Sequence, residues 1–190
     1  ADVVDDVRFG CCLNPTDAMN VTRIGALIAG IPDSVPAVTI NRVCISGMEA
    51  VLSGAAMIKA GDAEVILAGG VEHMSGVPYT IERARWGIRM GNDTITDAMT
   101  TGLHCGSHIL PYPADGPVEF FTGKPYIMGH TAEFVALKLG ITRQEQDEIA
   151  LRSHNNVERA TRDGSFAEEI VPITIPQKKG DPKVFDKDEH

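Results

Sequence analysis

An α/β fold is predicted for this chain by two strand-like runs and the apolar segment between them. The first run, AVTI (Ala37–Ile40), is short, partly β-branched and preceded by Pro36, and the second, EVILAGG (Glu64–Gly70), is apolar until it ends in paired glycines. Both patterns are typical of strands buried on both faces of a parallel sheet. The residues from about Cys44 to Ala60 are apolar on almost every side, which predicts a buried helix. Strand, helix and strand together form a βαβ unit.

The predicted helix ends at Gly61, and only Glu49 and Lys59 are charged within it. A βαβ unit with parallel strands places the turn from strand to helix at the carboxyl edge of the sheet, where α/β proteins hold their chemistry. Cys44 lies at this turn. Its surroundings therefore decide what the sequence says about function.

Beyond Val77 the apolar strand runs stop and two further helices are predicted. Residues 131–140 repeat apolar side chains at helical spacing and end in a glycine. The next segment opens with a capping box formed by Thr142 and Glu145 and ends at Gly164. After it, EEIVPITI (168–175) is predicted to be an edge strand, because a proline interrupts it. Residues 102–126 are predicted to be a long loop, because prolines are closely spaced there.

Composition excludes several classes of protein. The chain has 190 residues, 43% of them hydrophobic, and a formal net charge of −9 without a cluster of basic residues, so neither nucleic acid nor an anionic membrane surface is expected as a partner. We expect no apolar stretch to reach the roughly 18 residues of a spanning helix, and residues 1–20 are too acidic for a secretion signal. These features predict a cytoplasmic protein. Free thiols and no metal site are expected for the cysteines, which are Cys11, Cys12, Cys44 and Cys105, and Cys11 and Cys12 are expected to be core thiols.

On this pattern alone Cys44 fits two interpretations, a small buried core residue or a nucleophile. A thiol at the first turn of a helix faces unpaired backbone N–H groups and the positive end of the helix dipole, and both favour the thiolate. The same N–H groups can hydrogen-bond an oxygen that becomes negative when a thiolate attacks a carbonyl. Geometry by itself leaves the core interpretation slightly ahead.

The sequence motif around Cys44 favours the nucleophile interpretation. NRVCISG (41–47), followed by GDAEVILAGGVEHMSGVPY (61–79), resembles the nucleophile region of the thiolase family. The resemblance continues through MGHTAE (128–133) and to the end of the chain. In that family the cysteine of N-R-x-C-x-S-G accepts the acyl group, so the resemblance implies that Cys44 is the nucleophile. By the same resemblance Glu72 is structural and satisfies backbone donors, whereas we interpret His73 as a packed histidine.

The resemblance also implies the architecture. Thiolases have a layered αβαβα core made of two related halves, with an inserted loop domain that binds coenzyme A. We therefore expect residues 1–78 to be an incomplete N-terminal core half that carries the nucleophile, and residues 79–190 an incomplete loop domain. The implied reaction cleaves a 3-ketoacyl-CoA, or joins two acyl-CoAs, through an acyl-cysteine. Coenzyme A is then a substrate, and no cofactor is expected.

Two motifs of the family are absent from this sequence. Thiolases take their acid and base from a G-H-P histidine and a C-x-G cysteine, whereas here His130 is followed by Thr131 and Cys105 by Gly106 and Ser107. The chain thus resembles about half of a thiolase. We expect residues 1–190 alone to be inactive, with the acid–base half supplied by a missing segment or by a second polypeptide.

Met128 and Gly129 are the substrate-binding residues that the family motif implies beside the acyl-cysteine. Short-chain biosynthetic thiolases usually have a histidine before this M-G pair and an asparagine after the motif, where this chain has Ile127 and Phe134. The more apolar pair favours a longer acyl chain, since each buried methylene gains roughly 0.8 kcal/mol.

Two alternatives to a thiolase remain. One is another condensing enzyme of the same superfamily, which shares the fold but not the N-R-x-C-x-S-G wording. The other is a thiolase-like binding or scaffold subunit without catalysis. For the native protein we expect a homodimer or homotetramer, because the AVTI run suits an edge strand that needs a cover and the apolar helix leaves an uncovered surface.

Overall fold

The computed structural model describes residues 2–104 and 126–188. Contacts within the chain divide it into two compact units, Ala1–Gly129 and His130–His190, and each is described by itself. The predicted division after residue 78, which is drawn by role in the family, stays a prediction.

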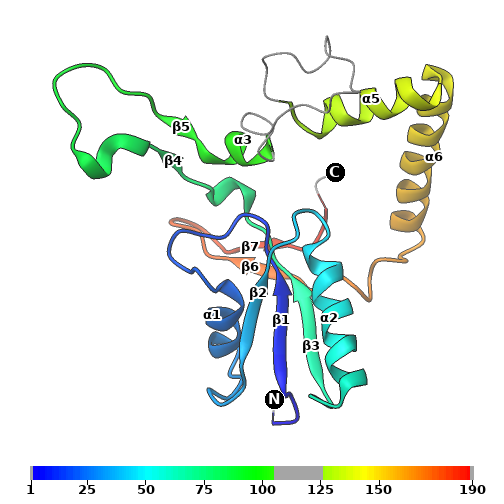
Figure 1. The fold of residues 1–190 in the computed structure, drawn as a ribbon. Coiled ribbons are helices and arrows are strands. Elements are labelled where there is room, and N and C mark those ends of the chain that lie inside the picture. Colours follow the sequence, from blue (N-terminus) through cyan, green and yellow to red (C-terminus); the bar gives the residue numbers. More distant parts are fainter. Residues whose placement is uncertain (1, 105–125, 189–190) are drawn as a thin grey trace. The chain divides into compact units, whose positions relative to one another are not determined.

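A three-stranded parallel sheet organises the first unit (Figure 1). Its strands are β1 (Asp6–Gly10), β2 (Ala37–Ile40) and β3 (Ile66–Gly70), in the order β2-β1-β3. The predicted βαβ unit is therefore confirmed, and β2 lies at an edge as expected. The central strand, β1, was not predicted and separates the two strands that were.

Two helices, α1 (Val21–Ile28) and α2 (Ser46–Ala60), cover opposite faces of this sheet. Successive side chains of a strand point to opposite faces, so β1 serves both helices. On one face Val7 packs with α1 in a small core completed by Ala26, Val35 and the partly buried Val4, Phe9, Ile31 and Ala37. On the other face Arg8 and Gly10 contact α2.

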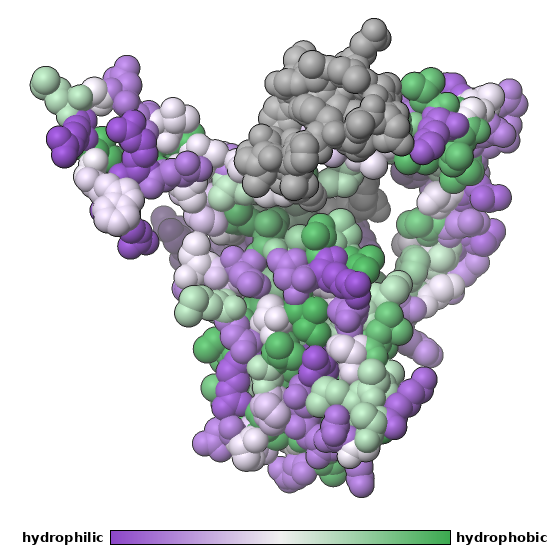
Figure 2. All heavy atoms as spheres, viewed as in Figure 1, coloured by the Kyte–Doolittle hydropathy of each residue, from purple (hydrophilic) through white to green (hydrophobic). Residues whose placement is uncertain are grey.

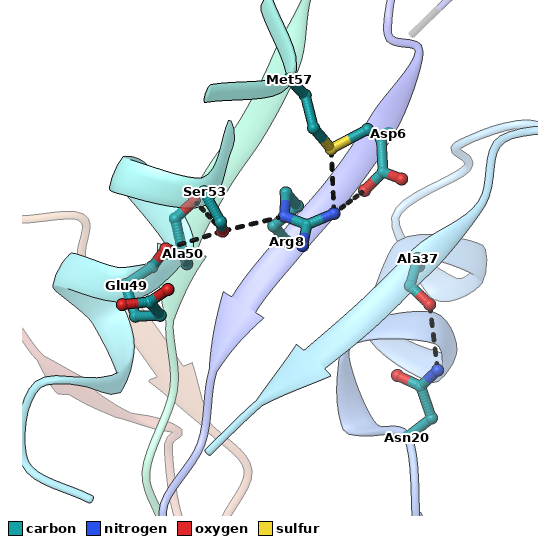
Figure 3. Close-up of polar contacts among 8 residues, drawn as sticks. All are labelled: Asp6, Arg8, Asn20, Ala37, Glu49, Ala50, Ser53 and Met57. Carbon is teal, nitrogen blue, oxygen red and sulfur yellow. Dashed lines mark hydrogen bonds and ion pairs between the residues drawn. The ribbon is translucent and has the colours of Figure 1, made fainter. Parts of the chain in front are cut away.

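A charged side chain, Arg8, lies at the contact between β1 and α2, where an apolar residue would be usual (Figure 3). Its Nε donates to the Ser53 hydroxyl at 3.1 Å, its Nη1 lies 3.1 Å from the Met57 sulfur, and an ion pair at 3.6 Å joins it to Asp6. Burial raises the pKa of the Asp6 carboxyl, and the Arg8 charge opposes that rise. The guanidinium is therefore satisfied by the helix, and a charged strand can lie at the centre of the sheet.

Helix α2 ends as predicted but is only partly buried. Gly61 adopts a left-handed conformation with φ 83°, which terminates the helix. The sheet-facing side buries Ser46, Ala50 and Gly54. Four of its large apolar residues stay exposed: Met48 at 62%, Val51 at 54%, Leu52 at 59% and Ile58 at 46%. Figure 2 shows hydrophobic residues at the surface among the hydrophilic ones.

The expectation of a helix buried all round and of strands buried on both faces is thus wrong for the residues that the structure describes. All residues of β2 are half-buried, and β3 has exposed residues within it. Among these residues only one side of α2 meets the sheet, and its other side is the uncovered apolar surface that was expected for this helix.

The expectation that no apolar stretch is long enough to span a membrane is also wrong, because one stretch has the necessary length and composition. Residues 43–60 have a mean hydropathy of 1.4 over 18 residues and pass that test of length and composition. In the structure most of these residues, Ser46–Ala60, form the crossover helix α2, which contacts β1 and β3. A helix that packs between layers of an α/β core has the same composition, so the test alone is weak evidence of a membrane span.

After β3 the first unit continues through short elements. A 3₁₀ turn at Met74–Gly76 leads to β4 (Tyr79–Thr80), which pairs antiparallel with β5 (Thr96–Asp97). Between them lies a 3₁₀ helix at Glu82–Trp86, and after β5 comes α3 (Ala98–Leu103). Most of the predicted 102–126 loop lies outside the described residues.

The second unit confirms both predicted helices. The element α5 spans Met128–Leu139 and begins just before the unit boundary, and α6 spans Arg143–Arg162. The capping box before α6 is present, because Thr142 and Glu145 each bond the other's backbone N–H. The predicted edge strand is shorter than expected, since β6 (Ile173–Ile175) begins only after Pro172 and pairs with β7 (Lys183–Phe185). Proline has no N–H to donate to the ladder, which accounts for this start.

Candidate active site

Three loops meet at the carboxyl edge of the sheet. Because β1, β2 and β3 are parallel, the residues that follow them, beginning with Cys11, Asn41 and Val71, leave the sheet at the same edge. Cys44 lies in the loop between β2 and α2, as predicted, and its side chain is exposed. The helix begins at Ser46 rather than at Cys44. The thiol therefore precedes the first turn instead of lying within it.

The residue before Cys44 has an unusual backbone conformation. Val43 has φ 53° and is the only non-glycine residue with positive φ among residues 2–104 and 126–188. A β-branched residue rarely adopts this left-handed region because its side chain crowds the backbone. Its N–H donates to Asn41 Oδ1 at 3.0 Å, and its carbonyl accepts from the Ser46 N–H at 3.1 Å. These contacts hold the turn that presents Cys44.

Ser46 closes the loop around the cysteine. Its side chain is buried, accepts the Arg42 N–H at 2.8 Å and donates to the Val43 carbonyl at 2.5 Å. Arg42 in turn forms an ion pair with Glu49 in the first turn of α2. The asparagine, arginine and serine of the N-R-x-C-x-S-G motif therefore all shape the loop from which the thiol projects.

Three glycines bring the start of α2 directly against the strand ends. A Cβ at Gly10 would lie 2.3 Å from the carbonyl carbon of Ser46 and 2.4 Å from the nitrogen of Gly47. A Cβ at Gly70 would lie 3.2 Å from the Gly10 carbonyl oxygen and 3.6 Å from the Gly47 Cα. Backbone therefore packs on backbone at this edge, which fixes the height of the helix start above the sheet.

The Glu72 carboxylate holds the loop after β1 through hydrogen bonds. Its Oε2 accepts the Cys12 N–H at 2.8 Å and its Oε1 accepts the Leu13 N–H at 2.9 Å. The structural role predicted for Glu72 is confirmed. The Cys12 carbonyl then accepts from Asn41 Nδ2 at 2.8 Å, so that the loops after all three strands are joined.

The cysteines of this edge differ in environment. Cys11 is 2% exposed and its thiol lies 3.6 Å from Glu72 Oε1. Burial, reinforced by the Glu72 carboxylate, raises the pKa of the Cys11 thiol. The expectation of a core thiol is thus confirmed for Cys11 and wrong for Cys12, which is half-buried. The exposed Cys44 does not fit the core interpretation within the described residues.

The start of α2 offers backbone donors next to Cys44. The residue in the N-cap position is Ile45, and no side chain caps this helix. The first N–H groups of a helix carry partial positive charge, and they can stabilise an oxygen on which negative charge develops. An exposed thiol beside such donors has the arrangement needed for nucleophilic attack on a carbonyl.

Other predicted residues are placed as follows. Met128 and Gly129 open α5, and the Met128 side chain is 44% exposed. Their proximity to Cys44 stays a prediction. The interpretation of His73 as a packed histidine is wrong, because this residue, which follows β3, is exposed, and its ring lies only against the nearby Gly76.

Sequence reasoning missed the residues that hold the site together. Asn41, Gly10 and Gly70 were not singled out for their structural roles. The pairing of Gly10 with the start of α2 has a faint signal, a glycine at the end of an apolar strand, but its partner cannot be read from local pattern.

Comparison with known proteins agrees with this architecture. The family model described as "Thiolase, N-terminal domain" matches residues 1–190. An acetyl-CoA acetyltransferase from Cupriavidus necator is 44% identical over 98% of this chain, and one from Pseudomonas aeruginosa is 43% identical over 100% of it. The crystal structure of the Bacillus anthracis acetyl-CoA acetyltransferase covers 99% of this chain with a TM-score of 0.82 and 42% identity.

The chain therefore belongs to the thiolase family and has the α/β fold of its N-terminal domain. It spans 44% of the length of each of the two curated relatives and 43% of the solved structure.

Proposed function

We propose that this chain carries the nucleophile of a CoA-dependent acyltransferase of the thiolase kind. The observation that carries the proposal is the placement of Cys44. It is an exposed thiol, held by the motif residues Asn41, Arg42 and Ser46, beside the uncapped start of a helix in a thiolase domain. The names of relatives, acetyl-CoA acetyltransferase and probable acetyl-CoA acyltransferase, support the same reaction class.

In the proposed reaction the Cys44 thiolate attacks the C3 carbonyl of a 3-ketoacyl-CoA. The C2–C3 bond breaks, and its electron pair remains on the departing acetyl-CoA enolate, which is then protonated. The acyl group stays on Cys44 as a thioester. A second CoA thiol takes up the acyl group, restores Cys44 and loses its proton to a base. Run in reverse, the same steps join two acyl-CoAs.

The protein around this chain is part of the proposal. Coenzyme A and acyl-CoA are the substrates, with no further cofactor, and Met128 and Gly129 line the acyl site. The acid and base come from a G-H-P histidine and a C-x-G cysteine outside residues 1–190, so this segment alone is inactive. The assembly is a cytoplasmic homodimer or homotetramer, and light scattering on the complete natural protein tests its size, since a monomer would contradict the edge-strand argument.

The experiment is to trap the acyl-enzyme. The complete natural protein that contains these residues is mixed with acyl-CoA, quenched in acid and mapped by mass spectrometry. The expected result is one acyl group on the peptide of Cys44, which is lost in Cys44→Ser. A thioester on another cysteine, or acyl transfer that persists in Cys44→Ser, would remove Cys44 from the reaction. A chain that binds acyl-CoA without being acylated would support the scaffold alternative.

A further inference from the structure

The turn at Val43 needs support from outside itself. Val43 adopts φ 53°, a region that valine disfavours, and it directly precedes Cys44. The backbone direction at residue 43 sets where the next side chain points. If residue 43 relaxed to negative φ, the Cys44 thiol would leave its position beside the start of α2. Such conformations persist only where surrounding contacts enforce them.

Asn41 supplies that support from one side-chain amide. Its Oδ1 accepts the Val43 N–H at 3.0 Å, and its Nδ2 donates to the Cys12 carbonyl at 2.8 Å. An amide offers both an acceptor and a donor, which neither an aspartate nor an alkyl side chain does. The local contact favours the turn, and the distant contact fixes the amide itself.

The distant contact is anchored in its turn. Glu72, after β3, accepts the N–H groups of Cys12 and Leu13 at 2.8 and 2.9 Å. The backbone around Cys12 is therefore held on its N–H side by Glu72 and on its carbonyl side by Asn41. Hydrogen bonds therefore connect Glu72 after β3 to Cys12 after β1, and Cys12 to Asn41 after β2. This network stops at Val43 and does not touch the Cys44 thiol.

We infer that Asn41 is a positioning residue for the nucleophile. Anchored by Glu72 through Cys12, it holds Val43 in the left-handed conformation that presents Cys44. This inference rests on the proposed function, because it gives Asn41 a role in the acylation of Cys44. Asn41 acts through Val43 and contacts no reacting atom in this arrangement.

A double-mutant cycle in the complete natural protein tests this role. The variants are Asn41→Ala, Val43→Gly and the double variant, and the readouts are the rate of Cys44 acylation and the KM for acyl-CoA. Asn41→Ala is expected to slow acylation about 100-fold with little change in KM, since a misplacement of about 1 Å has an effect of this size. Glycine adopts positive φ without strain, so the loss from Asn41→Ala should shrink by at least about tenfold in the Val43→Gly background.

Each outcome decides the matter. A wild-type rate in Asn41→Ala, or an equal loss in both backgrounds, would overturn the positioning role. Circular dichroism checks that the variants fold. If Asn41→Ala does not fold, Asn41→Ser replaces it, because the hydroxyl can accept the Val43 N–H but is too short to reach Cys12; a loss of about tenfold supports the inference and a wild-type rate overturns it. Failure of the proposed function looks different, since wild-type protein would then not be acylated at Cys44 at all.

Discussion

One added methyl group should have opposite effects at two glycines of the first unit. At Gly10 the new Cβ would lie 2.3 Å from the Ser46 carbonyl carbon and 2.4 Å from the Gly47 nitrogen. Both are backbone atoms, which cannot rotate away as a side chain can. Ordinary contact begins near 3.4 Å, so the start of α2 must retreat from β1 by about 1 Å.

The size of the effect follows from that displacement. Overpacking of this kind costs about 1–3 kcal/mol of unfolding free energy. The retreat also carries the Cys44 loop with it, and about 1 Å of misplacement slows a reaction about 100-fold. Gly25 is the matched control, because it lies within α1 and nothing stands within 4 Å of its Cβ position. There Gly→Ala should stabilise the protein by about 0.5–1 kcal/mol, since alanine has the higher helix propensity.

Urea unfolding of the complete natural protein, followed by circular dichroism, gives the stability of Gly10→Ala and Gly25→Ala against wild type. Acyl-enzyme trapping gives the rate at Cys44. We expect a lower urea midpoint and slow acylation for Gly10→Ala, and a raised midpoint with unchanged acylation for Gly25→Ala. If Gly10→Ala unfolds and reacts like wild type, the helix start is not pressed against the strand and the reasoning fails.

Three further predictions concern single contacts. Near pH 7 iodoacetamide should alkylate Cys44 before Cys11, because burial raises the pKa of the Cys11 thiol and keeps it protonated; a faster Cys11, read by peptide mapping, would contradict this. Thr142→Ala should destabilise the first turn of α6 by about 1 kcal/mol, seen as faster amide exchange there and nowhere else in the helix. Backbone N–H donors after α2 lower the pKa of Asp5, so its contribution to stability is present above its unfolded pKa and lost as pH falls through the folded value. Asp5→Asn should therefore weaken the protein at pH 7 and flatten its acid unfolding curve, and an unchanged curve would show that the bonds contribute nothing.

Local signals in the sequence determined where two of the helices end or begin. Gly61 marks the end of α2, and the Thr142–Glu145 capping box marks the start of α6, because both depend on residues only a few positions apart. The N-R-x-C-x-S-G motif indicated the family, and the βαβ pattern placed Cys44 at the carboxyl edge of the sheet. The sequence also predicted an uncovered apolar surface on the helix, but it could not show which side of α2 would meet the sheet, since a helix that is apolar almost all round has no distinct face.

The central strand was decided by tertiary contacts. In β1 the charged Asp6 and Arg8 alternate with apolar residues, so the segment resembles a half-exposed strand or a loop. The place of β1 at the centre of the sheet depends on Ser53 and Met57, which lie more than 40 positions away and accept hydrogen bonds from the Arg8 guanidinium. Local propensity does not contain this information, because the stabilising partners come from another element.

The contacts that hold the Cys44 loop were likewise visible only in three dimensions. Cys12 and Glu72 are 60 positions apart, and Asn41 joins them to Val43 through a side chain that could equally have faced solvent. A β-branched residue gives no sequence signal for positive φ, since that conformation is imposed by its neighbours against its own preference. The sequence by itself thus pointed to Cys44 as the residue proposed to attack, and folding determined how that residue is held, because the holding contacts exist only once three separate strand ends have been brought to one edge.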